Sequence, residues 1–134
     1  MIKNEAGAAI IRIFLGATFF IHGLAKFQGG IENTAAFFES LGLPGFTAYV
    51  VALIELLGGL ALVLGIGTKI VSILFAIIMV VATFKVKLAG GFLGNGEAAG
   101  FELDLALLAM AVFLVVTNKS SLALDNVLFQ SKEA

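Results

Sequence analysis

The sequence has 134 residues, of which 60% are hydrophobic and only 13% are charged. This apolar share exceeds the roughly 45–50% of ordinary water-soluble domains, and so few charges would not cover a water-exposed surface. The composition therefore excludes a typical soluble fold and predicts an integral membrane protein whose outer surface contacts the lipid bilayer. The formal net charge of −1 gives no electrostatic footprint for nucleic acid, so no such partner is expected.

Four apolar segments predict helices, at about residues 6–27, 46–64, 68–88 and 101–117. A helix of about 20 apolar residues spans the hydrocarbon core, because each residue adds about 1.5 Å. Pro44 suits the start of the second helix, and the short turn at residues 65–67 makes the second and third helices an antiparallel hairpin. The fourth segment is the shortest and begins with Glu102 and Asp104, so we expect its first turn among the lipid headgroups.

Two shorter amphipathic segments, at residues 33–41 and 122–129, are expected to lie flat on the membrane surface. The first apolar segment contains Arg12 and lacks a clean cleavage site, which indicates a retained signal anchor. No internal repeat or linker divides the chain. We therefore predict one domain over residues 1–134, an all-α four-helix bundle in the membrane with short interfacial helices.

Basic residues near the helix ends show a small excess on one side of the membrane. The side with the N-terminus carries Lys3, Lys69, Lys119 and Lys132, whereas the opposite loops carry Lys26, Lys85 and Lys87. Arg12, near the inner end of the first helix, adds to this excess. We expect a multi-pass protein with both termini in the cytoplasm.

Ionisable side chains at membrane depth are the main functional candidates, because each costs about 2.5–3.5 kcal/mol to insert and usually faces the bundle interior with a partner. On the first helix, Arg12, His22 and Lys26 fall within an arc of about 80°, at about 100° per residue. Phe19 borders the same stripe and is the candidate for ring stacking on a ligand. This face of the first helix is therefore expected to point inward.

Glu55 lies near the middle of the second helix. With antiparallel helices of matched ends, we expect it level with about Thr18, within side-chain reach of His22 and Arg12 and able to pair with either. A purely structural role is the alternative, since an Arg12–Glu55 pair would also fix the packing of the helices.

Glu102 and Asp104 open the fourth helix on the side where several basic residues gather. They are about 200° apart around a helix, so at most one can point at the bundle axis, and we favour Glu102. Asp104, Lys85 and Lys87 are better interpreted as residues that mark helix ends in the headgroup region.

A series of short motifs runs along most of the chain. They are Arg12 followed by residues 19–27 (FFIHGLAKF), then residues 38–44 (FESLGLP), 54–59 (IELLGG), 91–92 (GF), 100–103 (GFEL) and 124–125 (LD). Their order and spacing resemble those of the DoxX family of small membrane proteins. The chain departs from the family pattern at two places. Ala123 precedes Leu-Asp here, whereas the family has serine at that position, and this chain has Lys85 and Lys87 where some family members carry histidine.

This resemblance implies a four-helix protein of the bacterial cell membrane that is linked to redox metabolism, since the family is named for a subunit of a thiosulfate:quinone oxidoreductase. Within the family, the chain is most similar to the CatD-type membrane oxidoreductases of Gram-positive bacteria. We therefore expect a quinone, menaquinone or ubiquinone, to bind by its headgroup in a polar pocket between the helices.

Reduction of a quinone takes up two protons, so His22 and Glu55 are the candidate catalytic residues. Arg12, Phe19, Lys26 and Glu102 are the candidate contacts of the headgroup. With no cysteine and one histidine, the chain cannot hold a cysteine-bound iron–sulfur cluster or a bis-histidine haem, and it carries no dinucleotide fingerprint and no metal motif. Electrons would come from a redox partner or a small substrate, so whether the chain is an enzyme by itself stays open.

Two other functions stay open. The chain could be a non-catalytic membrane anchor or scaffold subunit, with a charge pair that fixes the bundle. It could also form a small-solute or proton pathway, in which His22, Glu55 and Glu102 act as a relay. Four helices are few for a transporter, so this second alternative requires a homo-oligomer.

Overall fold

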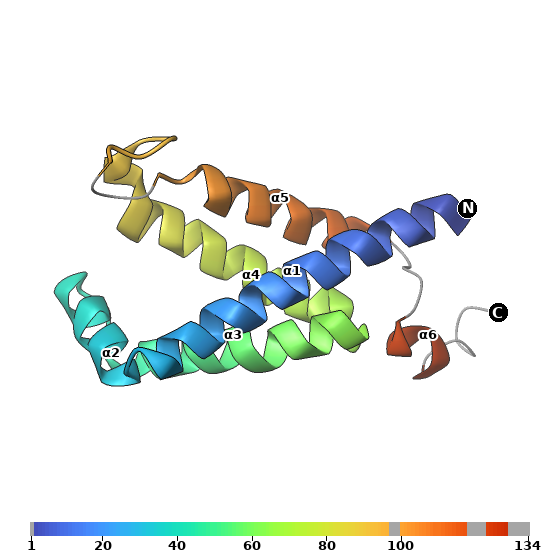
Figure 1. Ribbon diagram of the computed structural model, residues 1–134, viewed down its shortest axis with the longest axis horizontal. Coiled ribbons are helices and arrows are strands. Elements are labelled where there is room, and N and C mark those ends of the chain that lie inside the picture. The colour runs from blue at the N-terminus through green and yellow to red at the C-terminus, as the bar shows by residue number, and fades with distance from the viewer. Residues whose placement is uncertain (1, 97–99, 118–122, 129–134) are drawn as a thin grey trace.

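The computed structural model describes residues 2–96, 100–117 and 123–128, and every regular element in these ranges is helical. The α-helices are α1 (Ile2–Gln28), α2 (Ile31–Ser40), α3 (Phe46–Leu64), α4 (Thr68–Ala82), α5 (Glu102–Val116) and α6 (Leu124–Leu128). The prediction of an all-α bundle is confirmed (Figure 1). Helix α1 begins at Ile2, earlier than expected, whereas the start and end of α3 agree with the prediction.

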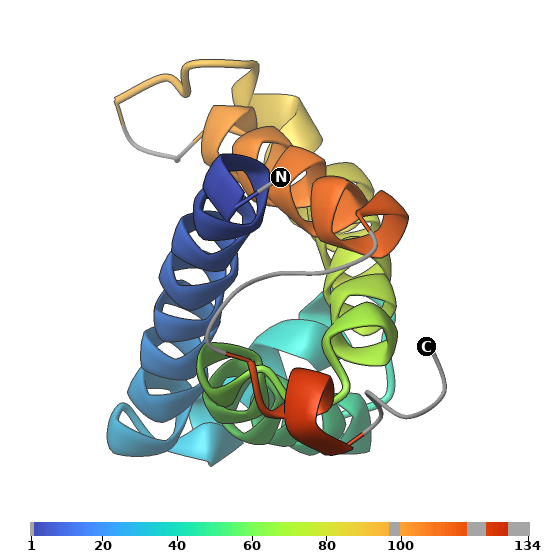
Figure 2. The ribbon, with the colours of Figure 1, turned by 90° about the vertical axis from the view of Figure 1, so that its right-hand side faces the viewer.

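Four helices, α1, α3, α4 and α5, surround a common axis when the bundle is viewed from its end (Figure 2). The N-terminus, the turn between α3 and α4, and α6 lie at one end, which we call the α6 end (Figure 1). Helix α2 and the connection from α4 to α5 lie at the other, which we call the α2 end. The sequence predicted the same grouping of the helix connections on two sides of the membrane. Which end faces the cytoplasm stays a prediction.

Helices α1 and α3 pack closely because glycines face each other where they cross. A Cβ atom added at Gly59 would lie 2.5 Å from the backbone nitrogen of Phe20 and 2.6 Å from the carbonyl oxygen of Gly16. A Cβ at Gly16 would lie 2.7 Å from the carbonyl oxygen of Gly59. Side chains are thus excluded on both sides of the contact, as at other close helix crossings in membranes.

The interior is a cluster of apolar side chains contributed by all four helices. Its buried members are Leu15, Phe19, Leu62, Phe75, Met79, Leu107, Ala111 and Leu114. The rings of Phe19 and Phe75 are stacked, with centroids 3.9 Å apart. Large apolar side chains such as Ile10, Leu57 and Phe84 cover the outside and are more than half exposed, as expected of a surface that contacts lipid.

Three stretches are long and apolar enough to cross a membrane: Lys3–Gln28, Phe46–Leu64 and Thr68–Lys87. Helix α5 has 15 residues, or about 22 Å, which is less than the roughly 30 Å of a hydrocarbon core. That its acidic start lies among the headgroups stays a prediction.

The third predicted helix, residues 68–88, is not uniform. It is an α-helix to Ala82, then a π-helix over Thr83–Lys87 and a 3-10 helix over Leu88–Gly90. Helix α2 corresponds to the predicted segment 33–41 and has no buried residue. Helix α6 falls inside the second predicted segment, 122–129, whose first and last residues lie outside the described ranges, as do Lys119 and Lys132.

Candidate functional site

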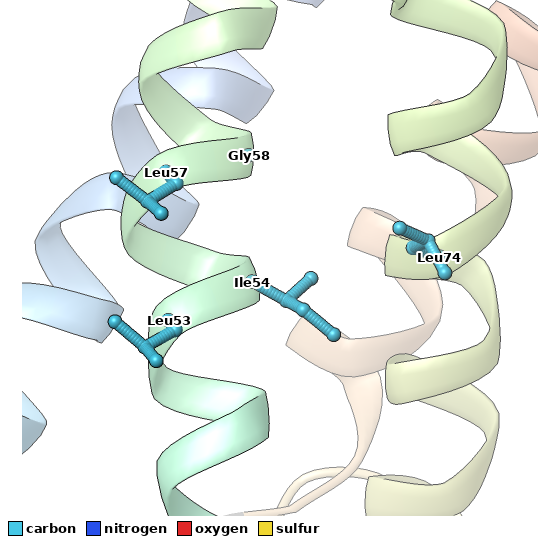
Figure 3. Close-up of a pocket in the computed structure, with 5 residues that line it drawn as sticks. All are labelled: Leu53, Ile54, Leu57, Gly58 and Leu74. Atoms are coloured by element: carbon cyan, nitrogen blue, oxygen red, sulfur yellow. The ribbon is translucent and has the colours of Figure 1, made fainter.

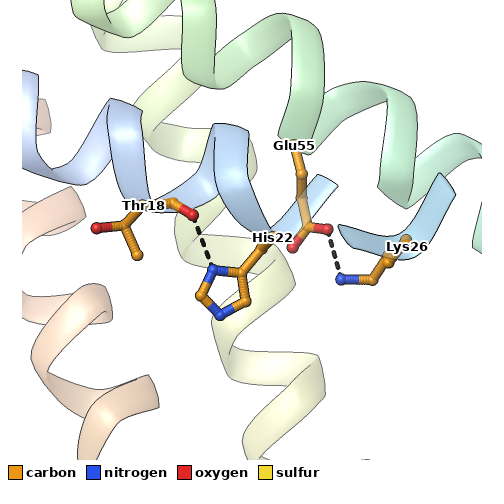
Figure 4. Close-up of polar contacts among 4 residues, drawn as sticks. All are labelled: Thr18, His22, Lys26 and Glu55. Carbon is orange, nitrogen blue, oxygen red and sulfur yellow. Dashed lines mark hydrogen bonds and ion pairs between the residues drawn. The ribbon is translucent and has the colours of Figure 1, made fainter. Parts of the chain in front are cut away.

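An ion pair joins α1 to α3. The Lys26 Nζ atom lies 2.7 Å from the Glu55 Oε1 atom, and the side chains are 23% and 4% exposed, respectively. The prediction that Glu55 forms its ion pair with His22 or Arg12 is therefore wrong, because the partner is Lys26. Side chains on a helix point back toward its N-terminus, so the long stem of Lys26 carries its ammonium group from the helix end down to Glu55 (Figure 4).

His22 lies one turn before Lys26 on the same helix (Figure 4). Its Nδ1 atom is 2.8 Å from the carbonyl oxygen of Thr18. A carbonyl oxygen can only accept a hydrogen bond, so Nδ1 must carry a proton. In the neutral ring Nε2 is then the unprotonated nitrogen, which can accept a hydrogen bond.

Gly23 positions these side chains against α3. A Cβ at Gly23 would lie 2.6 Å from the backbone nitrogen of Leu56 and 2.9 Å from the carbonyl oxygen of Ala52, so only glycine permits this approach. His22 and Lys26 flank Gly23, and the Glu55 carboxylate acts electrostatically on both. We call these three residues the His22–Lys26–Glu55 cluster.

The cluster is open on one side. The His22 side chain is exposed at the bundle surface, Lys26 is partly exposed and Glu55 is buried. The helices that carry the cluster, α1 and α3, contain two of the stretches that are long and apolar enough to cross a membrane. The arrangement offers hydrogen-bond donors and an acidic partner within helices that are otherwise largely apolar.

Arg12 lies at the other end of the bundle. It is fully buried, and its Nη2 atom donates to the carbonyl oxygen of Val63 over 3.4 Å. Val63 is eight residues, or about 12 Å, along α3 from Glu55. The expectation that Arg12 shares a pocket with His22 and Glu55 is thus wrong, because a common face does not bring together residues separated along the helix axis.

The chain was compared with known proteins. A family model for DoxX matches residues 7–88, which contain most of α1, all of α2, α3 and α4, and the whole His22–Lys26–Glu55 cluster. The chain belongs to the DoxX family. It is 44% identical over 129 residues to the "Putative oxidoreductase CatD" of Bacillus subtilis, covering 96% of this chain and 92% of that protein.

Two more distant relatives are membrane proteins by name. An uncharacterized membrane protein of Mycobacterium tuberculosis is 30% identical over 125 residues, covering 86% of this chain and 77% of that protein. The inner membrane protein YqjF of Escherichia coli is 25% identical over 125 residues, covering 93% and 94%. No solved structure matches the chain. A membrane location for this DoxX protein follows from these relatives and from its three apolar spans.

At the start of α5 in this DoxX protein, Asp104 faces inward and Glu102 does not. Asp104 is 5% exposed and its Oδ1 atom lies 3.5 Å from the Lys87 Nζ atom, whereas Glu102 is exposed. The expectation that Glu102 faces the bundle axis is therefore wrong. Lys87 is the last residue of the π-helix, and its ion pair with Asp104 joins this helix to α5. Lys87 and Asp104 therefore contact each other, beyond the predicted position at helix ends.

Phe19, predicted to contact a ligand, lies in the core of this DoxX protein. It is 1% exposed and one face of its ring is covered by Phe75. Its ring centroid is 6.4 Å from that of His22, so it forms the apolar floor beside the cluster. Contact of Phe19 or Glu102 with a ligand stays a prediction.

A second feature is an apolar groove of about 270 Å³ between α3 and α4 (Figure 3). It is lined by Leu53, Ile54, Leu57, Gly58 and Leu74. Ile54 and Leu74 point into the space between the two helices. No polar side chain lines the groove, so it offers no chemistry beyond contact with hydrocarbon. The part of the chain that the structure describes also holds no group of three potential metal ligands from His, Cys, Asp and Glu.

Asp125 is the polar residue whose role the sequence did not reveal. Its carboxylate accepts from the backbone N–H groups of Gly67, at 2.9 Å, and Thr68, at 3.1 Å. The only signal in the sequence was the Leu-Asp pair at residues 124–125, which the family resemblance marked without assigning it a partner.

Proposed function

We propose that this DoxX protein is a membrane redox subunit that binds a quinone headgroup at the His22–Lys26–Glu55 cluster and exchanges protons with it. The observation that supports the proposal is the geometry of His22. Its Nδ1 proton is held by the Thr18 carbonyl group, which leaves Nε2 for exchange at an exposed position beside a buried ion pair.

The chemistry of the cluster fits a quinone. A quinone headgroup presents two carbonyl oxygens, which accept hydrogen bonds, and it takes up two electrons and two protons on reduction. Lys26 donates through its ammonium group, and His22 donates through Nε2 when the ring is charged. The exposed side of His22 is reached from the bilayer, in which long-chain quinones dissolve.

The three residues have different tasks in this proposal. His22 gives and takes the proton at Nε2, while Nδ1 keeps its bond to Thr18 and the ring keeps its orientation. Glu55 stabilises the positive charge of the protonated ring through the electrostatic interaction between them. Lys26 neutralises Glu55 and stabilises negative charge that develops on a bound headgroup.

The electrons come from outside the chain in this proposal. The sequence has no cysteine and one histidine, and it carries no dinucleotide fingerprint, so a redox partner or a small substrate must supply them. The name of the Bacillus subtilis relative, a putative oxidoreductase, supports a redox role without naming the substrate.

A second candidate function, a non-catalytic anchor subunit, is favoured by one observation. The Lys26–Glu55 pair joins α1 to α3 next to the close approach at Gly23, so the same residues can serve packing alone. The two functions differ in whether His22 matters, because its hydrogen bond to the Thr18 carbonyl group lies within α1 and does not join α1 to another helix.

Quinone content separates the two functions. The protein would be purified from a membrane in mild detergent, and extracted menaquinone and ubiquinone would be measured per mole of protein. We expect bound quinone in the native protein and at least a tenfold loss in His22→Ala and Glu55→Gln. Glu32→Gln, on the exposed face of α2, is the matched acid control and should retain the quinone.

Thermal unfolding of each variant completes the experiment. Loss of quinone from His22→Ala with an unchanged melting temperature would support the proposal. A native protein that never carries quinone, together with variants that lose only stability, would refute it and favour the anchor. Proton flux into liposomes that disappears in Glu55→Gln would instead favour the pathway.

A further inference from the structure

The chain returns to the α6 end of the bundle just before α6 and is fastened there. The backbone N–H of Asp125 donates to the carbonyl oxygen of Gly65 over 2.9 Å. The carboxylate of Asp125 accepts from the N–H groups of Gly67 and Thr68, the first donors of α4. Three hydrogen bonds thus hold one residue against the turn between α3 and α4.

Ala123 closes the same contact. It is 8% exposed and lies directly over Gly65, where an added Cβ would collide with both its Cα and its Cβ atoms. Gly65 has φ 77°, a left-handed conformation that favours glycine and ends α3. The turn is therefore shaped to receive a small residue from the C-terminal part of the chain.

Arg12 lies beneath this contact. A Cβ added at Gly65 would also be 3.2 Å from the guanidinium carbon of Arg12, so the guanidinium group packs beside Ala123 against the same turn. Arg12 is 0% exposed, and Asp125 interacts with it electrostatically. The guanidinium group is thus enclosed by α1, by the end of α3 and by the returning chain.

We propose that residues 123–125 form a latch that closes the α6 end of the bundle, with Asp125 as the fastening residue and Arg12 as the group that the latch shields from water. The latch is held by the three hydrogen bonds of Asp125 and the Ala123 contact, whereas the bundle is held by the separate apolar core. It can therefore open without unpacking the helices. In the open state, Arg12 meets the aqueous phase and becomes available to anionic groups there.

The sequence permits a direct test, because Arg12 is the single arginine of the chain. Phenylglyoxal, which reacts with arginine side chains, therefore labels the protein at Arg12, and mass spectrometry gives the rate. We expect slow labelling of the native protein in detergent micelles and at least a tenfold faster rate in Asp125→Asn. Asp104→Asn, a matched substitution near the α2 end, should be labelled at the native rate.

Two glycines of the turn provide a second test that keeps Asp125 in place. Gly65→Ala and Gly67→Ala both place a side chain at positive φ, 77° and 60°, and so carry similar backbone strain. Only the Cβ at Gly65 meets the latch, since nothing lies within 4 Å of a Cβ at Gly67. We expect Gly65→Ala to accelerate labelling and Gly67→Ala to have a much smaller effect.

Circular dichroism and gel filtration would show that each variant retains its helices. Labelling of folded Asp125→Asn at the native rate would overturn the proposal, because Arg12 would then be shielded by the helices alone. If Asp125→Asn is recovered only as an aggregate, the glycine pair decides, and equal labelling rates in Gly65→Ala and Gly67→Ala would overturn it.

Discussion

Replacement of Lys26 by methionine should destabilise the bundle more than replacement of Glu55 by glutamine, although both remove the same ion pair. The reason is the difference in burial between the two side chains, 23% exposed for Lys26 and 4% for Glu55. Lys26→Met leaves a buried carboxylate without its counter-ion. Glu55→Gln leaves an ammonium group that can turn toward the headgroups on its flexible stem.

The expected magnitudes follow from that asymmetry. Removing one partner of a buried pair typically costs about 3–5 kcal/mol, and we expect about 3 kcal/mol for Lys26→Met because the pair lies near the open side of the cluster. Glu55→Gln keeps a side-chain oxygen that can accept from Lys26, so we expect a loss of about 1 kcal/mol. The double variant should be more stable than Lys26→Met alone, because it contains no unpaired charge.

The measurement is the free energy of unfolding in detergent micelles, titrated with sodium dodecyl sulfate and followed by circular dichroism. Lys85→Met, at an exposed position on the same end of the bundle, is the matched control and should change stability little. Equal losses for Lys26→Met and Glu55→Gln, or a smaller loss for Lys26→Met, would show that burial does not set the cost and would refute this reasoning.

Three further changes test the packing and the latch. Gly59→Ala should cost about 1–3 kcal/mol in the same titration, because its Cβ meets the α1 backbone; Gly7→Ala, with nothing within 4 Å, is its control. Phe75→Ala should cost about 3 kcal/mol, since it removes a stacked core ring, and a loss below 1 kcal/mol would contradict the packing. Asp125→Asn should lower stability by about 1 kcal/mol through the weakened α4 cap, and an unchanged unfolding curve would refute that role.

Helix positions were predictable from the sequence because apolar runs and glycines mark them strongly. Helix α3 begins and ends where Pro44, Gly45 and Gly65 suggest. The change from α-helix to π-helix at Thr83 was not predictable, since residues 83–87 carry no proline or glycine and differ from their neighbours only in two lysines. The wider turns of the π-helix, compared with those of an α-helix, are visible only in the backbone structure.

The partners of the charged residues were harder to predict. Periodicity showed that at most one of Glu102 and Asp104 can face the bundle axis. The rest of α5 is apolar on every side, so its rotation about its own axis could not be predicted from the pattern. The pairing of Glu55 depended on the register of α1 against α3. Gly23 packs between Ala52 and Leu56, so Glu55 lies about one helical turn closer to Lys26 than matched helix ends imply.

Arg12 illustrates a further limit. Its enclosure depends on residues more than 100 positions away in the sequence, which meet it only because the chain returns to the α6 end. A helical wheel places Arg12 on the same stripe as His22 and so suggests a shared pocket. The wheel discards distance along the axis, which is about 15 Å between these two residues.

The stacked pair of Phe19 and Phe75, with Leu15 and Leu62 beside it, forms an apolar layer between the level of His22 and the level of Arg12. Such a layer gives the protein a sidedness. If His22 exchanges protons as proposed, a proton that reaches its Nε2 atom would enter from the compartment at the α2 end, because the rings and aliphatic side chains of this layer carry no hydrogen-bonding group. Turnover at His22 would therefore draw protons from one compartment, and it would not discharge a gradient across the membrane.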